Sequence, residues 1–123
     1  MKKLFILILT LFTINASSAE YETNFTIESF NQAQNEGKII VVHSWNKFCS
    51  TCSKQKPILI EAKKDFEDIL FLNYEQVKDK NIAKYLNINY WTTIAIYKNN
   101  KQIISTIGLT EKNEIYNFIK KGT

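Results

Sequence analysis

The two cysteines of this chain, Cys49 and Cys52, are separated by only two residues. A thiolate can attack a disulfide to form a mixed disulfide, and a second thiol nearby can then release the partner. The pair follows the apolar run 39–42 and precedes a segment with helical periodicity. A helix N-terminus stabilises a thiolate on the first sulfur. The pattern therefore predicts disulfide exchange, with Cys49 as the nucleophile and Cys52 as the resolving thiol.

Other uses of the pair are less favoured by the sequence. A structural disulfide across so short a gap would restrict the unfolded chain little. A structural zinc site needs four ligands, and the chain adds only one histidine, His43, to its two cysteines. We therefore expect no metal and no cofactor. Two alternatives stay open: a thiolate module that binds or delivers Cu(I), which soft ligands favour, and an interaction domain with little turnover.

The first residues have the pattern of a signal peptide. Lys2 and Lys3 precede the mostly apolar run 4–14, and small residues follow up to Ala19. The apolar run is shorter than the roughly 20 residues needed to span a bilayer. We expect residues 1–19 to be removed, which leaves one domain, 20–123, in the periplasm or outside the cell. The alternative is an uncleaved N-terminal membrane anchor.

The basic residues are all lysine, 16 in number, so arginine clamps for phosphate groups are absent. Two of these lysines lie in the expected signal peptide, which contains no acidic residue, so its removal lowers the net charge from +4 to +2. The remaining lysines are scattered, as on a solvated surface, and this disfavours a nucleic-acid partner. The short chain leaves no room for an added dimerisation domain, so we expect a monomer.

Hydrophobic periodicity predicts helices that alternate with strands and a final hairpin. The expected helices are 26–36, 49–68, 79–86 and 110–121, and the expected strands are 39–44, 69–74, 93–97 and 103–107. Pro57 should kink the second helix, and Thr110 should be the N-cap of the last helix in an approximate capping box with Asn113. The order predicts an α/β fold in which helices cover a mixed sheet. The cysteines then fall at the C-terminal end of a central strand, the usual ligand edge.

Several of these motifs together resemble the thioredoxin family. A strand runs through Trp45 into the cysteine pair, Pro57 follows five residues after Cys52, and Gly108 lies between the hairpin and the last helix. The resemblance covers residues 25–122. It implies a thioredoxin-like fold, with a central mixed β-sheet flanked by helices, and the activity of a protein-disulfide oxidoreductase. It also implies partners that carry disulfides or dithiols, and a membrane or periplasmic redox protein that recycles the pair.

The chain departs from this family at positions expected to face the sulfurs. His43 stands where the family has a buried carboxylate, so it is a candidate for proton transfer or thiolate stabilisation; the alternative is a neutral core histidine. Thr92 replaces the family's cis-proline in the partner-facing loop with Trp91. A non-proline cis bond costs about 2.5–4 kcal/mol, so we expect a trans Trp91–Thr92 bond. Lys47, near Cys49, can lower a thiol pKa or be a solvated lysine.

Overall fold

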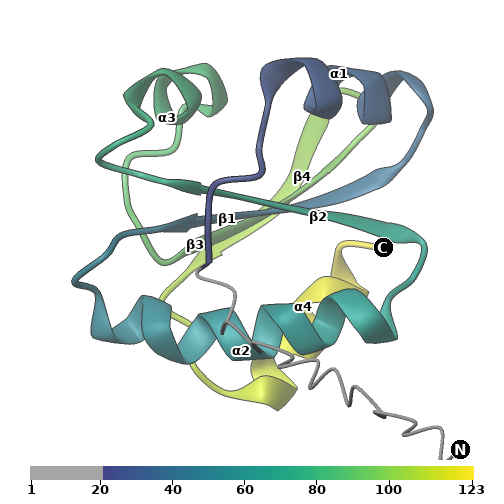
Figure 1. Cartoon of the computed structure of the whole chain (residues 1–123). Coiled ribbons are helices and arrows are strands. Elements are labelled where there is room, and N and C mark those ends of the chain that lie inside the picture. The colour runs from purple at the N-terminus through teal and green to yellow at the C-terminus, as the bar shows by residue number, and fades with distance from the viewer. Residues whose placement is uncertain (1–20) are drawn as a thin grey trace, which may run out of the picture.

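The computed structural model describes residues 21–123. The expected signal peptide, residues 1–19, therefore lies outside the described residues. Helices and strands alternate along the described part of the chain, and a hairpin and a last helix complete the order (Figure 1). The elements are α1 (Ile27–Asn35), β1 (Ile39–Trp45), α2 (Ser50–Asp65), β2 (Ile69–Glu75), α3 (Lys80–Leu86), β3 (Thr93–Lys98), β4 (Lys101–Ile107) and α4 (Lys112–Lys121). Within residues 21–123, no helix combines the length and the apolar character that crossing a membrane requires.

The four strands form one mixed sheet in the order β2-β1-β3-β4. β1 pairs in parallel with β2 and antiparallel with β3, and β3 pairs antiparallel with β4. Helices α1 and α3 cover one face, and α2 and α4 cover the other (Figure 1). β1 is therefore a central strand with both faces covered, which explains its nearly continuous apolar sequence. The predicted α/β fold with a mixed sheet is confirmed.

Two hydrophobic cores lie on opposite faces of this sheet, because successive side chains of a strand point to opposite faces. Ile40 of β1 packs in the core that contains Phe30 of α1. Val41 packs in the other core with Leu59 of α2 and Ile115 of α4. His43 of β1 has the same parity as Val41, so it faces α2. The alternation of β1 thereby directs a polar side chain toward the helix that carries the cysteines.

Two expected helix boundaries are wrong. The second helix ends at Asp65 rather than residue 68, because Phe66 leaves the helical conformation (φ −111°, ψ 74°) and its carbonyl accepts from the N–H of Ile69 in the turn that leads into β2. The last helix begins at Lys112, with Glu111 as its N-cap and no side-chain capping bond, so the predicted capping box at Thr110 does not form. Leu109 packs against the core between α2 and α4, and its carbonyl accepts a hydrogen bond from a buried α2 side chain. The N-cap therefore lies one residue later than expected.

The predicted hairpin is confirmed, with longer strands than expected. Asn99 and Asn100 have positive φ angles of 52° and 63°, as a two-residue turn between antiparallel strands requires. Asparagine tolerates this backbone region better than most residues. The backbone N–H of Asn100 donates to Gln34 of α1 over 2.8 Å, which ties the turn to the rest of the fold.

Candidate redox-active disulfide site

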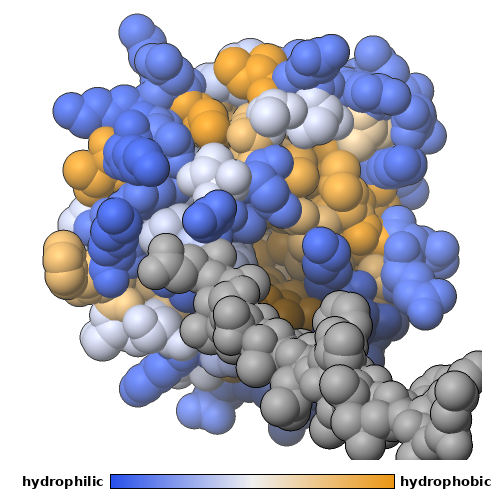
Figure 2. Space-filling model, in the orientation of Figure 1, coloured by the Kyte–Doolittle hydropathy of each residue, from blue (hydrophilic) through white to orange (hydrophobic). Residues whose placement is uncertain are grey.

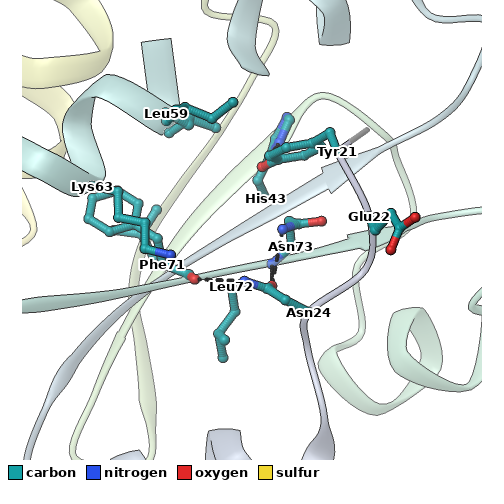
Figure 3. Close-up of a pocket in the computed structure, with 11 residues that line it drawn as sticks. Tyr21, Glu22, Asn24, His43, Leu59, Lys63, Phe71, Leu72 and Asn73 are labelled. Carbon is teal, nitrogen blue, oxygen red and sulfur yellow. Dashed lines mark hydrogen bonds between the residues drawn. The ribbon is translucent and has the colours of Figure 1, made fainter. Parts of the chain in front are cut away.

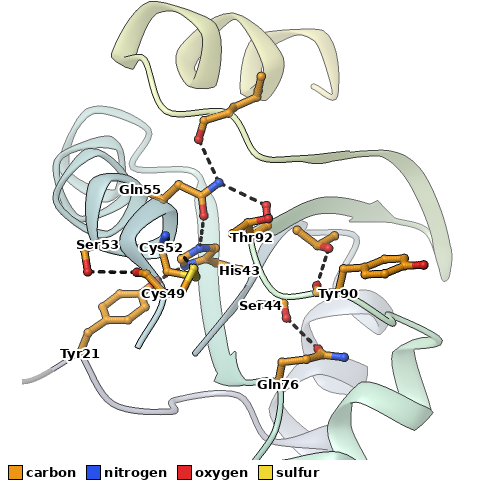
Figure 4. Close-up of a disulfide and its surroundings, with 12 residues drawn as sticks. Tyr21, His43, Ser44, Cys49, Cys52, Ser53, Gln55, Gln76, Tyr90 and Thr92 are labelled. Carbon is orange, nitrogen blue, oxygen red and sulfur yellow. Dashed lines mark hydrogen bonds between the residues drawn. A yellow bond between two sulfur atoms is a disulfide. The ribbon is translucent and has the colours of Figure 1, made fainter. Parts of the chain in front are cut away.

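Cys49 and Cys52 form a disulfide at the start of α2 (Figure 4). Cys49 is the N-cap residue, with an extended backbone, and its Sγ accepts a hydrogen bond from the N–H of Cys52 over 3.0 Å. Cys49 is 8% exposed, whereas Cys52 is completely buried. When the bond is reduced, the same N–H and the helix dipole stabilise a thiolate on Cys49. Cys49 is thus the more accessible of the two cysteines.

Trp45, at the end of β1, packs beside the disulfide. Its ring packs in one cluster with both cysteines and Tyr21. The indole Nε1–H donates to Asn73 Oδ1 over 2.9 Å, which fixes the orientation of the ring. Tyr21 meets Trp45 edge to face, with 5.5 Å between the ring centroids. These contacts make the surroundings of the sulfurs apolar and rigid on this side.

Lys56 is a charged residue beside the disulfide site that was not predicted from the sequence. Its Nζ lies 4.3 Å from the ring centroid of Trp45, in a cation–π contact. Partial burial lowers the pKa of Lys56, and the charge of Glu75 acts in the opposite direction. The spacing in the sequence could have indicated this position, because Lys56 follows Cys52 by four residues and therefore lies on the same side of the helix.

His43 is buried behind the disulfide and both of its ring nitrogens are engaged. Nε2 lies 2.9 Å from Oε1 of Gln55, and Nδ1 lies 3.0 Å from the hydroxyl of Tyr21. Gln55 donates its amide N–H groups to the carbonyls of Thr92 and Leu109, so its Oε1 must be the acceptor toward His43. This network assigns the proton to Nε2 and leaves Nδ1 to accept from Tyr21.

Burial lowers the pKa of His43 to about 4, with a smaller lowering from Lys56 and an opposing effect of the Gln55 hydrogen bond. The imidazole is therefore uncharged at neutral pH. A neutral ring does not attract a thiolate as an imidazolium would. The arrangement corresponds to the buried, hydrogen-bonded core histidine considered in the sequence analysis. Its role in proton transfer stays a prediction.

The Trp91–Thr92 peptide bond is trans, as expected, since the described chain contains no cis bond. Thr92 has a φ of 66°, which is rare for a β-branched residue. Its N–H donates to Ser44 O of β1 over 2.7 Å, and its carbonyl accepts from Gly108 N–H over 3.1 Å. The loop is thus fixed from both sides, while the side chain of Trp91 is half exposed.

Lys47 lies in the short connection between β1 and α2, and its side chain is exposed. The neighbouring Phe48 is 99% exposed. Both residues border a surface groove of about 580 Å³ that continues over Trp45 to Lys56 and Pro57. The structure therefore places Lys47 at the rim of the site, two residues before Cys49. Its influence on the thiol stays a prediction.

A cavity of about 420 Å³ lies between α2, the sheet and the first described residues (Figure 3). Leu59, Phe71 and Tyr21 line it, Lys63 borders it, and the ring of His43 forms part of its wall. Apolar side chains surround a hollow on this face of the molecule (Figure 2). Within residues 21–123, no three His, Cys, Asp or Glu side chains gather as metal ligands.

Gln55 and Tyr21, like Lys56, were missed by our sequence analysis. Gln55 has a detectable signal, because it falls in the buried stripe of α2 with Cys52, Leu59 and Ala62. A polar side chain in an apolar stripe needs a buried partner. Tyr21 has no such signal, since it precedes the first helix and belongs to no periodic segment. Only the folded chain brings it to His43.

A disulfide between an N-cap cysteine and a buried second cysteine, at the edge of a mixed sheet covered by helices, defines a protein-disulfide oxidoreductase. The chain belongs to the thioredoxin family, because the sequence model of the Thioredoxin family matches residues 22–121.

Curated relatives agree with this assignment. The chain is 29% identical to the thioredoxin of Rickettsia felis over 102 residues, and the match covers 80% of this chain and 95% of the relative. It is 30% identical to the thioredoxin of Rickettsia prowazekii, with the same coverage of 80% and 95%. The expected family membership is confirmed.

Solved structures show the same fold at lower sequence identity. Trxlp from Edwardsiella tarda superimposes with a TM-score of 0.72 at 20% identity, covering 76% of this chain and 93% of that structure. Fasciola hepatica thioredoxin gives a TM-score of 0.69 at 17% identity, covering 78% and 93%. The thioredoxin-like architecture predicted from the sequence is therefore confirmed.

Proposed function

We propose that this protein is an exported oxidoreductase that exchanges disulfides with partner proteins through Cys49 and Cys52. The observation that carries the proposal is the asymmetry of the pair. Cys49 caps a helix and retains some exposure, whereas Cys52 is completely buried. A partner disulfide can therefore meet Cys49 but not Cys52.

In the reducing direction, the thiolate of Cys49 attacks one sulfur of a partner disulfide. A bond forms between Cys49 and that sulfur, and the other partner sulfur leaves as a thiolate and takes up a proton. Cys52 then loses its proton and attacks Cys49, which releases the first partner sulfur as a second thiolate. Two electrons have passed from the cysteine pair to the partner. The reverse sequence oxidises a dithiol partner, and the reduction potential of the pair decides which direction prevails.

Export is supported by the sequence of residues 1–19, with its two lysines, apolar run and small residues before the expected cleavage site. A disulfide in the domain is also compatible with an oxidising compartment. In the periplasm or outside the cell, the partners would be proteins that carry disulfides or dithiols. A membrane or periplasmic redox protein would then return the pair to its working state.

Trapping of mixed disulfides tests the roles of the two cysteines. We expect Cys52→Ser to accumulate mixed disulfides with protein partners, because the resolving thiol is missing. Cys49→Ser should not accumulate them, because its remaining thiol is buried. Mass spectrometry of alkylated complexes measures both. Equal trapping by the two variants would show that the assigned roles are wrong.

A further inference from the structure

We propose that Gln55 is a positioning residue that fixes the two loops beside the disulfide, at Thr92 and Leu109, and holds His43 in a single tautomer. The inference rests on the proposed disulfide exchange and adds a residue to it. Gln55 lies one turn after Cys52 on α2 and is completely buried.

The hydrogen bonds of Gln55 reach three other parts of the fold (Figure 4). Its Nε2 donates to Thr92 O over 3.2 Å and to Leu109 O over 2.9 Å. Its Oε1 accepts from His43 over 2.9 Å. Both amide N–H groups and the amide oxygen are therefore engaged. One side chain thus links the cysteine helix to β1, to the loop before β3 and to the loop after β4.

The loop at Thr92 needs such support because its backbone is strained. A non-glycine residue at positive φ costs about 1–3 kcal/mol and persists only where surrounding contacts impose it. The N–H of Thr92 is held by Ser44, and its carbonyl is shared by Gly108 N–H and Gln55. Gln55 is the one of these contacts that comes from the cysteine helix. It therefore sets the position of the loop relative to the sulfurs.

A rigid loop matters most for a large partner. A protein disulfide that reaches Cys49 must lie against the neighbouring loops, and loops ordered in advance lower the entropic cost of binding. A small disulfide reagent can reach Cys49 without using them. Loss of Gln55 should therefore weaken the reaction with protein disulfides more than the reaction with small ones.

The test compares Gln55→Met with Gln34→Met. Methionine keeps the length of the side chain and removes the amide. Gln34 is also buried, and its amide oxygen accepts one hydrogen bond, from Asn100 N–H, on the opposite side of the sheet. The probes are insulin, as a protein disulfide, and 5,5′-dithiobis(2-nitrobenzoate), as a small disulfide. We expect Gln55→Met to raise the KM for insulin about tenfold, with less than about threefold change in the rate with the small reagent. Gln34→Met should change neither.

A spectroscopic readout separates positioning from general stability. His43 is the only histidine of the chain, so its ring nitrogens give unambiguous NMR signals. We expect the Nε2-protonated tautomer in the wild type and a mixture of tautomers in Gln55→Met. If that variant does not fold, Gln55→Glu serves instead for the insulin measurement alone. It keeps the acceptor for His43, so the tautomer is expected to stay that of the wild type, and it loses both loop contacts.

The outcomes distinguish this inference from the proposed function. If the reduced wild type reacts with neither probe, the proposed function is wrong. If it reacts with both and the Gln55 variant that folds keeps the wild-type KM for insulin, the inference about Gln55 is overturned while the function stands. A loss of insulin reduction as large in Gln34→Met would also overturn it.

Discussion

At the scale of single residues, His43 shows how burial changes the chemistry of a side chain. In water its imidazole would titrate near pH 6.5. Behind the disulfide it exchanges water for Tyr21 and Gln55, which satisfy both ring nitrogens without adding charge. The cost of burying an imidazolium then keeps the ring neutral. Burial thus lowers the pKa of a histidine in this position, whereas it would raise the pKa of the carboxylate that the family resemblance implies there.

The buried histidine predicts a stability that falls with acid. Because the folded pKa of about 4 lies below the unfolded value, the unfolded state binds more protons between pH 4 and 6.5. The free energy of unfolding should therefore drop by about 2 kcal/mol between pH 7 and pH 5. Urea unfolding of the oxidised protein at several pH values measures this. His43→Gln, which retains an amide donor and cannot titrate, should lose this contribution.

If the wild type and His43→Gln had the same pH dependence, the histidine would not be buried in neutral form. An NMR titration of the single histidine checks the same point directly. Its ring signals should stay those of the neutral form at pH 6, where an unburied histidine is already largely protonated.

At the scale of elements, the end of α4 is held against the sheet by a close contact. Gly122 caps this helix, and a Cβ added there would overlap the side chain of Ile96 on β3. Its φ is negative, so the need for glycine comes from space rather than from the backbone. The sequence alone shows a glycine after a helix, which usually signals a left-handed cap.

We expect Gly122→Ala to lower the free energy of unfolding by about 1–2 kcal/mol, because overpacking forces Ile96 or the helix end to move. Lys121→Ala, one residue earlier and exposed, should change it by less than about 0.5 kcal/mol. Urea denaturation of the oxidised forms measures both. Equal stabilities of the two variants would mean that the chain end moves aside at no cost.

At the scale of the whole molecule, removal of residues 1–19 can be tested independently of disulfide exchange. We expect the protein recovered from the periplasm or the medium to begin at Glu20, which intact mass determines. Ala19→Lys, which places a large charged residue at the expected cleavage site, should remain full-length in the membrane fraction. Full-length wild-type protein in the membrane fraction would instead support the N-terminal anchor.

The sequence by itself determined the order of the elements and the place of the cysteine pair. These depend on short-range signals: apolar periodicity, the glycines and asparagines of turns, and the position of a helix after a strand. The same short-range signals also led to the two wrong helix boundaries. The periodic count carried the second helix to Asp68, three residues past its end at Asp65, and a threonine with suitable spacing suggested the wrong N-cap at Thr110.

Only the tertiary structure decided the surroundings of the disulfide. His43 meets Gln55 across 12 positions of the chain and Tyr21 across 22, and Gln55 meets Leu109 across 54. No local pattern encodes such pairings, because they depend on which faces of the elements pack together. The sequence identified the thiols, and packing determined which neutral, hydrogen-bonded groups lie behind them.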